Sequence, residues 1–179
     1  MELVVSANLK KAKAFIDGMS QLSRGGFNPE AVVAQACLET GWFHHMAAPH
    51  NYFGMKCPRK WTGEFQSVQT VEFIDGKEVV IEDKFCAFDS VSHGLTHYVQ
   101  KIIELYPYAW TNRFNPRDFF KGLQNGLHTK AGWTARWSTD PNYQTKLTSI
   151  YDQIQSKKDF IDMLAPRMKE YLDAMHGEN

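Results

Sequence analysis

The sequence predicts an α+β domain that is mainly helical, with a small β-hairpin lobe flanking a cleft. Three observations support this fold class. Several segments place apolar residues at helical spacing. One strand–turn–strand pattern is centred on Asp75-Gly76. The chain has 179 residues, of which 43% are hydrophobic, and this is enough for one core. We therefore expect a single domain over residues 1–179.

The first half of the chain contains two predicted helices. Residues 8–23 carry an apolar stripe at helical spacing, and Gly25 follows as a stop signal. The second helix begins at Asn28-Pro29, because asparagine suits the N-cap and proline suits the first helical position. Its body is almost entirely apolar up to Gly41, so we expect this helix to be buried.

A β-hairpin is predicted after an irregular segment at 44–63. The expected strands, 67–74 and 77–88, flank Asp75-Gly76, a favoured two-residue turn. Successive side chains of a strand point to opposite faces. One face of the first strand should therefore carry Val68, Thr70, Glu72 and Ile74.

Helices resume after the hairpin. The capping and breaking residues predict one helix from Ser90 or Ser92 to about Leu105, a short one from Asn115-Pro116 to about Gly126, one from Asp140-Pro141 to about Ile154, and a last one over 158–175. Pro166 lies inside the last stretch and should kink or split it.

Composition excludes several classes of protein. Lys+Arg and Asp+Glu are both 20, so the chain is not a strongly basic nucleic-acid binder. It also lacks a polybasic run for a membrane surface. A neutral protein has to recognise an anionic polymer through a local cleft.

The cysteines and the N-terminus bear on the cellular compartment. The three cysteines, Cys37, Cys57 and Cys86, are best read as small buried hydrophobes, although one disulfide could form among them. The first 15 residues do not resemble a signal peptide, and no segment is long and apolar enough to span a bilayer. We expect a protein made in the cytoplasm without a signal peptide.

Glu39 is the first candidate catalytic residue. It lies near the end of a helix that is otherwise apolar, within Gln35-Ala36-Cys37-Leu38-Glu39-Thr40-Gly41-Trp42. Burial raises the pKa of a carboxyl group, so Glu39 could remain protonated near neutral pH, as a general acid for a glycosidic oxygen requires. The alternative is a helix-end carboxylate paired with a lysine or arginine.

Six blocks of sequence resemble one known family. The segment 34–42 resembles the A-Q-x-x-L-E-[ST]-G-W signature of the glycoside hydrolase family 73 N-acetylglucosaminidases. The blocks at 50–56, 61–63, 70–72, 85–90 and 137–143 resemble the family's N-N-x-F-G-[IM]-K, W-x-G, T-x-E, F-R-x-Y-x-S and Y-A-T-D-P-x-Y patterns. Their common order, over about 28–154, makes the resemblance specific. Residues 157–179 form a C-terminal extension beyond it.

The resemblance implies a lysozyme-like fold and hydrolysis of the β-1,4 bond after N-acetylglucosamine in peptidoglycan, without a cofactor. It implies that Glu39 is the catalytic acid, that Glu72 is the second carboxylate, and that Tyr143 is an essential cleft residue. Candidate substrate-binding residues are Asn51, Phe53, Gly54, Lys56, Trp61 and Trp137. The chain departs from the family pattern at His50, Cys86, Phe88 and Trp137; these departures leave the acid in place and change side chains expected at the sugar subsites.

Each of these residues also has a plainer interpretation. Glu72 could be a solvated strand residue, with Glu64, Asp75 and Asp83 as rivals for its role. If functional, Glu72 could activate water or act as a nucleophile, or the N-acetyl group of the substrate could replace it. Plainer roles for the others are core packing of Tyr143 and the other aromatic residues, loop capping by Asn51 and solvation of Lys56.

The sequence predicts no metal site. His44, His45 and His50 lie near Cys57, and His93 and His97 are four residues apart, but no H-E-x-x-H or paired C-x-x-C motif is present. Histidines on helix surfaces are the default interpretation. A metal-dependent amidase or peptidase is correspondingly disfavoured.

Alternatives to the glucosaminidase function are an N-acetylmuramidase or lytic transglycosylase on the same fold, or a non-catalytic cell-wall-binding protein. Two settings fit a lysin without a signal peptide. One is a phage endolysin, and the other is an effector injected into a competitor's periplasm, for which an immunity protein would occlude the cleft. We expect a monomer that acts in the periplasm or cell wall.

Overall fold

The computed structural model describes residues 2–128, 130 and 134–177, and side chains from residue 8 onward. Its elements are α1 (Glu2–Gly18), α2 (Ser20–Arg24), α3 (Pro29–Thr40), β1 (Phe65–Ile74), β2 (Lys77–Cys86), α4 (Val91–Leu105), α5 (Pro107–Thr111), α6 (Pro116–Asn125), β3 (Leu127–His128), β4 (Thr134–Ala135), α7 (Tyr143–Ile154) and α8 (Lys158–His176). The mainly helical α+β fold class is confirmed.

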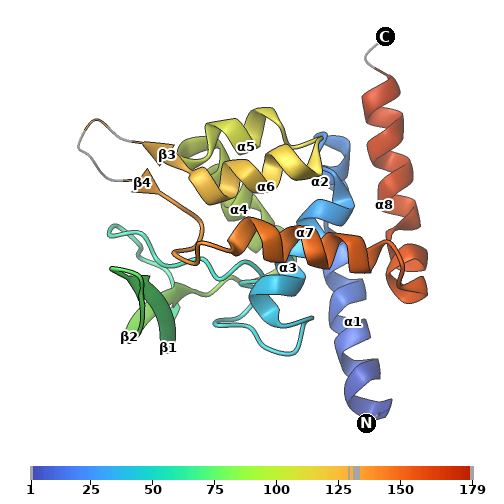
Figure 1. Ribbon diagram of the computed structural model, residues 1–179. Coiled ribbons are helices and arrows are strands. Elements are labelled where there is room, and N and C mark those ends of the chain that lie inside the picture. The colour runs from blue at the N-terminus through green and yellow to red at the C-terminus, as the bar shows by residue number, and fades with distance from the viewer. Residues whose placement is uncertain (1, 129, 131–133, 178–179) are drawn as a thin grey trace.

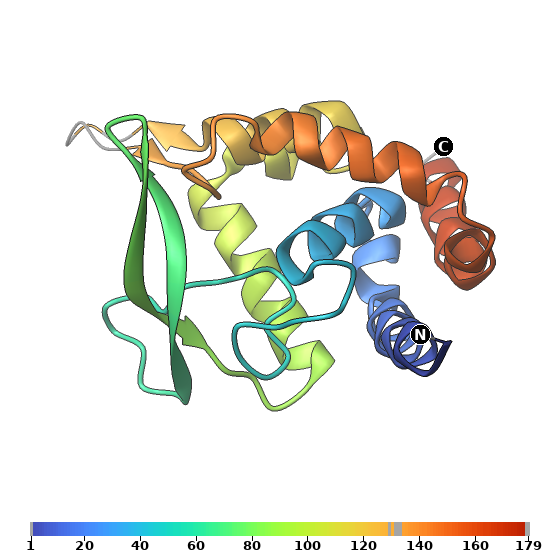
Figure 2. The same cartoon turned by 60° about the horizontal axis from the view of Figure 1, so that its bottom comes forward.

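The helices form one body, and the β1–β2 hairpin projects from one side of it. Figure 1 places the hairpin at the lower left, opposite α1 and α8 at the right. The turned view keeps the same separation and shows α4 and α3 between the two sides (Figure 2). The hairpin and the α1–α8 side of the body therefore lie on opposite sides of α3 and α4.

Helix α3 runs through the core of the helical body. The Asn28 side chain caps it by accepting a hydrogen bond from the Ala31 N–H at 3.0 Å, and Pro29 occupies the first turn. Every residue from Ala31 to Cys37 is buried, and α6, α7 and α8 pack around the helix. Gly41 ends it in the left-handed conformation at φ 55°. The predicted start, burial and end are confirmed.

The β-hairpin has the predicted register. Ile74 pairs with Lys77 across the turn, and Asp75 and Gly76 have φ values of 50° and 74°. Two positive φ values at the turn match the strand twist of a type I′ hairpin. Most residues of both strands are exposed, so few core contacts hold the hairpin in place.

The base of the hairpin is attached to the segment before it. Lys56 forms an antiparallel bridge with Phe85, and the Cys86 N–H donates to the Met55 carbonyl at 3.1 Å. The buried Asn51 amide donates to the carbonyls of Met55 and Cys86, and its oxygen accepts from the Met55 N–H. These bonds fix Gly54 to Lys56 relative to β2.

Three expectations about the helices were wrong in detail. The N-terminal helix begins at Glu2, and Met19 divides it into α1 and α2, both of which pack against α8. Helix α5 was not predicted. Of the two outcomes expected at Pro166, the split is excluded, because α8 is continuous; Pro166 lies on its exposed side, where water can satisfy the carbonyl that loses its partner.

Helix α7 begins at Tyr143, three residues later than Asp140. The Asp140 side chain accepts from the Asn142 N–H at 2.8 Å and forms a turn that precedes the helix. Cys37, Cys57 and Cys86 are free thiols, and Cys37 and Cys86 are buried. In the part of the chain that the structure describes, no helix is long and apolar enough to cross a membrane.

Candidate active site

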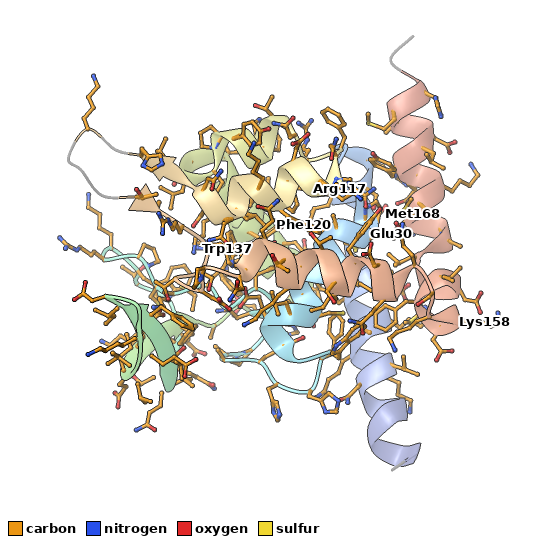
Figure 3. The ribbon with its side chains drawn as sticks, viewed as in Figure 1. Glu30, Arg117, Phe120, Trp137, Lys158 and Met168 are labelled. Carbon is orange, nitrogen blue, oxygen red and sulfur yellow. The ribbon has the colours of Figure 1, made fainter. Side chains whose placement is uncertain are left out.

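Glu39 lies in the last turn of α3 and opens into a cleft of about 380 Å³ between the helical body and the hairpin. Five parts of the chain line this cleft: the end of α3 with the loop after it, β1 at Val68 to Glu72, β2 at Phe85, α4 at Lys101, and the segment from Arg136 to Thr139. Figure 3 shows Trp137 on the side of the body nearest the hairpin. The cleft therefore has its acid on a rigid helix and its opposite wall on a strand.

The environment of Glu39 favours the neutral carboxyl group. Burial raises its pKa from 4.5 to about 7, and the charge of Glu72 acts in the same direction. The hydrogen bond from Tyr143 and the charge of Lys101 lower the pKa, but by less. Among the described residues, no lysine or arginine forms an ion pair with Glu39. A substantial fraction of the molecules is therefore protonated at neutral pH.

Tyr143 contacts the acid directly. Its hydroxyl donates to Glu39 Oε1 at 2.6 Å and accepts from the Gln35 amide at 3.2 Å. The side chain is buried at the start of α7, and its pKa is raised well above the usual value by burial and by Glu39. The plainer interpretation of a core tyrosine is therefore incomplete, because this buried phenol also touches the acid.

Gly54 lies against the other oxygen of the acid. A Cβ atom at this position would lie 2.9 Å from Glu39 Oε2, and Gly54 has a φ of 59°. Both the close approach and the left-handed backbone require glycine here. The loop after α3 therefore passes beside Oε2 without covering it with a side chain.

Lys101 is a cleft residue that the sequence analysis missed. Its Nζ lies 4.6 Å from the centre of the Trp137 ring, and the Lys101 pKa is lowered to about 8 by burial, against the attraction of Glu39. It follows Tyr98 by three residues and so shares the buried stripe of α4 with Gly94 and Ile102. A lysine on an apolar helix face was the signal that could have identified it.

Glu72 is held between the hairpin and the body. Lys56 Nζ donates to its Oε1 at 2.5 Å, and the Thr139 hydroxyl donates to its Oε2 at 2.5 Å. Asp83 also pairs with Lys56, at 2.8 Å. Burial lowers the Lys56 pKa, but the bonds to Asp83 and Glu72 outweigh burial and raise it. The side chain of Glu72 is only 14% exposed, so it is not a solvated strand residue.

With this geometry known, comparison with other proteins identifies the family. Residues 18–156 match the family model Glucosaminidase, described as mannosyl-glycoprotein endo-β-N-acetylglucosaminidase. The match covers more than half of the chain.

The chain belongs to the glucosaminidase family.

Relatives and solved structures agree with this membership. The peptidoglycan hydrolase FlgJ of Pseudomonas aeruginosa is 30% identical over 141 residues, which is 74% of this chain and 33% of FlgJ. The chain thus spans about a third of the length of that relative. The crystal structure of a peptidoglycan hydrolase mutant from Sphingomonas sp. A1 has a TM-score of 0.66 at 25% identity, covering 86% of this chain and 98% of the other.

A second solved structure is the truncated glycoside hydrolase domain of FlgJ from Salmonella typhimurium. It has a TM-score of 0.56 and 28% identity, and the match covers 82% of this chain and 99% of that domain. The glucosaminidase fold of this chain is therefore that of a glycoside hydrolase domain, with Glu39 at the end of its buried helix.

Two of the expected substrate-binding residues lie in the interior. Asn51 uses its amide to hold the backbone of the loop, and Phe53 stacks on Tyr98 with the ring centres 3.8 Å apart. Trp61 packs on His97 and Phe88, away from the lining of the cleft. In this glucosaminidase these side chains shape the walls of the site, and the structure does not favour a direct sugar contact for them.

The remaining expected residues line the cleft. Gly54, Lys56 and Trp137 do so together with Glu39 and Glu72. The Trp137 indole N–H donates to the Phe53 carbonyl at 3.1 Å, which fixes the ring beside Lys101. Thr139 was missed by the sequence analysis, because only the tertiary structure brings it to the strand that carries Glu72.

No metal site is found among the described residues: no group of three or more histidine, cysteine, aspartate or glutamate side chains is arranged to hold an ion. The two histidines of α4, His93 and His97, both pack on Phe88. His93 approaches Asp89, while His97 packs on Trp61 and Phe88, and its pKa is lowered mainly by burial.

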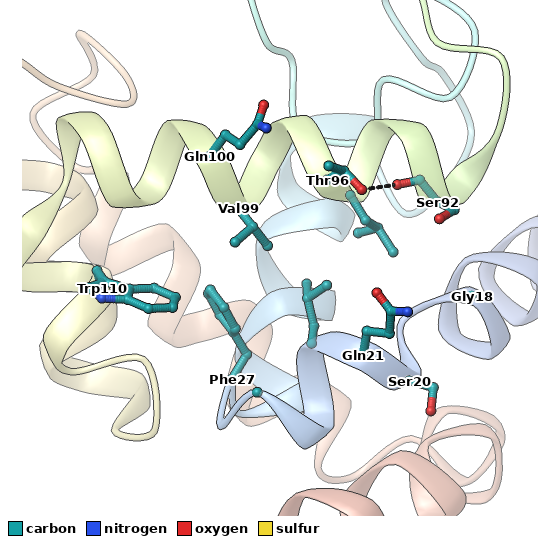
Figure 4. Close-up of a pocket in the computed structure, with 12 residues that line it drawn as sticks. Gly18, Ser20, Gln21, Phe27, Ser92, Thr96, Val99, Gln100 and Trp110 are labelled. Atoms are coloured by element: carbon teal, nitrogen blue, oxygen red, sulfur yellow. Dashed lines mark hydrogen bonds between the residues drawn. The ribbon is translucent and has the colours of Figure 1, made fainter.

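Another cavity, of about 390 Å³, lies between α2 and α4 (Figure 4). Its lining is mostly apolar and includes Phe27, Val99 and Trp110, and the bond from the Thr96 hydroxyl to the Ser92 carbonyl lies at its edge. It is lined by no carboxylate, histidine or cysteine. The chemistry of this glucosaminidase is therefore to be sought in the cleft at Glu39.

Proposed function

We propose that this protein is a peptidoglycan hydrolase that cleaves the β-1,4 bond after N-acetylglucosamine in the glycan strand. One observation carries the proposal: a glutamate with a pKa raised to about 7 opens into a cleft between two walls. A general acid must be protonated when the substrate binds and must reach the glycosidic oxygen. The family and the FlgJ relatives supply the substrate class.

In the proposed mechanism Glu39 donates its proton to the glycosidic oxygen. The bond from this oxygen to the anomeric carbon breaks, its electron pair stays with the leaving sugar, and positive charge develops on the ring of the other sugar. Glu39 becomes a carboxylate in this step. The Tyr143 hydroxyl and the Lys101 cation both favour that carboxylate, so they stabilise the state that the proton transfer produces.

Glu72 is the proposed second carboxylate. Each of its two oxygens accepts one hydrogen bond, from Lys56 or from Thr139. Each oxygen has a second lone pair that can accept another hydrogen bond. Glu72 could therefore stabilise the developing cation, orient a water molecule, or help position the N-acetyl group of the substrate. Substitution of Glu72 by glutamine should lower kcat and should also lower the pH at which Glu39 loses its proton, because the Glu72 charge helps to raise the Glu39 pKa.

The lining of the cleft suits a glycan with acidic side groups. Lys56, Lys101 and Arg136 contribute positive charge, and Trp137 contributes an aromatic ring of the kind that stacks on sugars. This local charge meets the requirement that a neutral protein recognise an anionic polymer through its cleft.

Purified sacculi provide the test of the proposal. Wild-type protein should clear a suspension of sacculi, and Glu39→Gln should not, because glutamine has no acidic proton to donate. Glu64→Gln is the matched control, since Glu64 is an exposed carboxylate that does not line the cleft. If wild type clears the sacculi no faster than Glu39→Gln, the proposed activity is wrong.

Mass spectrometry of the released fragments separates the proposed bond from its alternatives. Reducing N-acetylglucosamine ends support the proposal. Reducing N-acetylmuramic acid ends would instead identify a muramidase, and anhydro-muramic ends would identify a lytic transglycosylase. A protein that binds sacculi without releasing fragments would be a cell-wall-binding module.

We also propose that the protein acts in the periplasm as a bacteriolytic effector, because the proposed substrate lies there, and that an immunity protein blocks the cleft in the producing cell. Expression behind an exported leader should lyse a bacterial host, and the same chain expressed without a leader should not. A neighbouring gene whose product abolishes lysis and protects Glu39 from solvent would support the effector, whereas a neighbouring holin gene would identify an endolysin.

A further inference from the structure

A chain of buried hydrogen bonds leads from α4 to the acid. The Tyr98 hydroxyl donates to Gln35 Oε1 at 2.7 Å, and Gln35 Nε2 donates to the Tyr143 oxygen at 3.2 Å. The Tyr143 hydroxyl then donates to Glu39 Oε1 at 2.6 Å. Tyr98, Gln35 and Tyr143 are all at least 97% buried, so water does not replace these bonds.

This chain of hydrogen bonds gives every donor an acceptor in only one direction. If the Gln35 amide were reversed, its NH₂ group would face the Tyr98 oxygen, and the described residues offer the Tyr98 proton no other acceptor. A buried hydroxyl proton without an acceptor is costly. The Tyr98 ring cannot turn away easily, because it stacks on Phe53 with the ring centres 3.8 Å apart and the planes 14° from parallel.

The direction of the chain decides which oxygen of the acid carries its proton. Because Gln35 donates to the Tyr143 oxygen, the Tyr143 proton points to Glu39 Oε1, and that oxygen acts as an acceptor. The acidic proton is left on Oε2, the oxygen beside Gly54 in the cleft. With the proton on Oε1 instead, two protons would compete for one short contact.

We propose that Tyr98 and Gln35 are positioning residues that orient the Tyr143 hydroxyl and thereby hold the acidic proton of Glu39 on Oε2, where it meets the glycosidic oxygen. This inference rests on the proposed function of Glu39. The proton leaves Oε2 for the leaving oxygen while the Tyr143 bond to Oε1 strengthens, because a carboxylate is the better acceptor.

Several other groups act on Glu39 and have to be kept constant in a test. Lys101, Tyr98 and Tyr106 reach it from α4 and the residue after it, Glu72 reaches it from β1, and Tyr143 from α7. Lys56 and Arg136 line the same cleft. Replacing tyrosine by phenylalanine changes none of these charges.

The test compares two tyrosines that lie near the acid. Tyr98→Phe removes the first donor of the chain of hydrogen bonds. Tyr106→Phe removes a hydroxyl whose pKa is raised in part by the charge of Glu39 but which makes none of these hydrogen bonds. The pKa of Glu39 is measured by ¹³C NMR of its side-chain carboxyl carbon, and the alkaline limb of kcat/KM is measured on sacculi.

Loss of a hydrogen bond to the carboxylate should raise both midpoints by about one pH unit in Tyr143→Phe. Tyr98→Phe should move them in the same direction by about half a unit. The Gln35 amide can then reverse, and its oxygen competes with Glu39 Oε1 for the Tyr143 proton. Tyr106→Phe should leave them unchanged. Gln35→Met removes the donor that orients and polarises the Tyr143 hydroxyl, so it should move the midpoints in the same direction as Tyr98→Phe, and it serves if that variant folds poorly.

Two outcomes would overturn the inference. Equal midpoints in Tyr98→Phe and Tyr106→Phe would show that the chain does not orient Tyr143, and an unchanged midpoint in Tyr143→Phe would show that its proton does not point to Glu39. The NMR titration does not depend on catalysis. An inactive wild-type protein with shifted titrations would therefore contradict the proposed function and leave the chain of hydrogen bonds supported.

Discussion

At the scale of single residues, the acidity of Glu39 is set by opposing influences. Burial is the largest and raises the pKa, while Tyr143 and Lys101 lower it. The balance leaves the pKa at about 7, which suits an acid that must hold its proton at neutral pH and release it to the substrate. The two influences that lower the pKa come from separate elements, Tyr143 on α7 and Lys101 on α4, so each of them can be removed by one substitution.

Substitution of Lys101 should move the pH profile of activity. The Lys101 cation favours the Glu39 carboxylate, so its removal in Lys101→Met should raise the Glu39 pKa and shift the alkaline limb of kcat/KM upward by about half to one pH unit. Lys101→Arg keeps the charge and is the control. The profile is measured on sacculi between pH 4 and 9, and identical limbs for the two variants would contradict an electrostatic role.

Gly54 should be intolerant of even one added carbon. Gly54→Ala places a methyl group 2.9 Å from Glu39 Oε2, so it should displace the acid. A small displacement of a catalytic group should lower kcat by about tenfold or more. Gly76→Ala is the matched control, because Gly76 also has a positive φ but has open space around it. Both variants carry similar backbone strain, so equal losses of activity would exclude a specific contact with the acid.

At the scale of elements, the position of the hairpin depends on a few polar contacts. Thr139 joins the segment before α7 to β1 through Glu72 and by accepting from the Phe73 N–H at 3.0 Å. On the other side, Lys56 joins the loop to Glu72 on β1 and Asp83 on β2. Because the strands are mostly exposed, these contacts set how the wall carrying Glu72 faces Glu39.

Removal of the Thr139 hydroxyl should loosen this wall. Thr139→Val should lower kcat/KM by about tenfold, as expected for loss of a hydrogen bond to a charged group, and should speed hydrogen exchange at the Phe73 amide. Thr145→Val, at an exposed position of α7, is the control. Unchanged exchange at Phe73 in Thr139→Val would mean that other contacts hold the hairpin.

Elements with strong local signals could be predicted from the sequence. The Asn28-Pro29 start and the Gly41 end defined α3, and Asp75-Gly76 defined the hairpin, because caps and turns depend on neighbouring residues. The split at Met19 and the continuity of α8 at Pro166 could not be predicted in this way. They depend on how those segments pack against the rest of the molecule.

At the scale of the whole molecule, the site joins segments that are distant in sequence. Glu39 was identified from its own helix and from a family resemblance, and the resemblance also pointed to Tyr143. Lys101 has no local motif, and Thr139 lies in the 137–143 block without any sign of its role; both roles follow from tertiary contacts, with Trp137 and Glu72 respectively. Sequence patterns likewise could not distinguish Asn51, which braces the loop, from a residue that faces the cleft.

Keeping the acid neutral should cost stability at alkaline pH. The folded pKa of Glu39, about 7, lies above its ordinary value of 4.5, so the folded state binds the proton more tightly. The stabilising effect is therefore complete below pH 4.5 and is lost as the pH rises through 7. Relative to Glu39→Gln, wild type should lose about 3 kcal/mol of unfolding free energy between these limits.

Urea unfolding of both proteins at pH 4.5, 6 and 8 checks this difference. Glu64→Gln controls for the loss of an exposed carboxylate. A constant difference between wild type and Glu39→Gln over this range would mean that the folded and unfolded states share one pKa at Glu39.

The most direct test of Glu39 as the general acid is the titration of its carboxyl group in the wild-type protein. Its ¹³C signal is assigned by its absence in Glu39→Gln and followed from pH 3 to pH 9. We expect a midpoint near 7 that coincides with the alkaline limb of activity on sacculi. A midpoint near 4.5 would leave Glu39 ionised at neutral pH, and it could not then be the acid that cleaves the glycan.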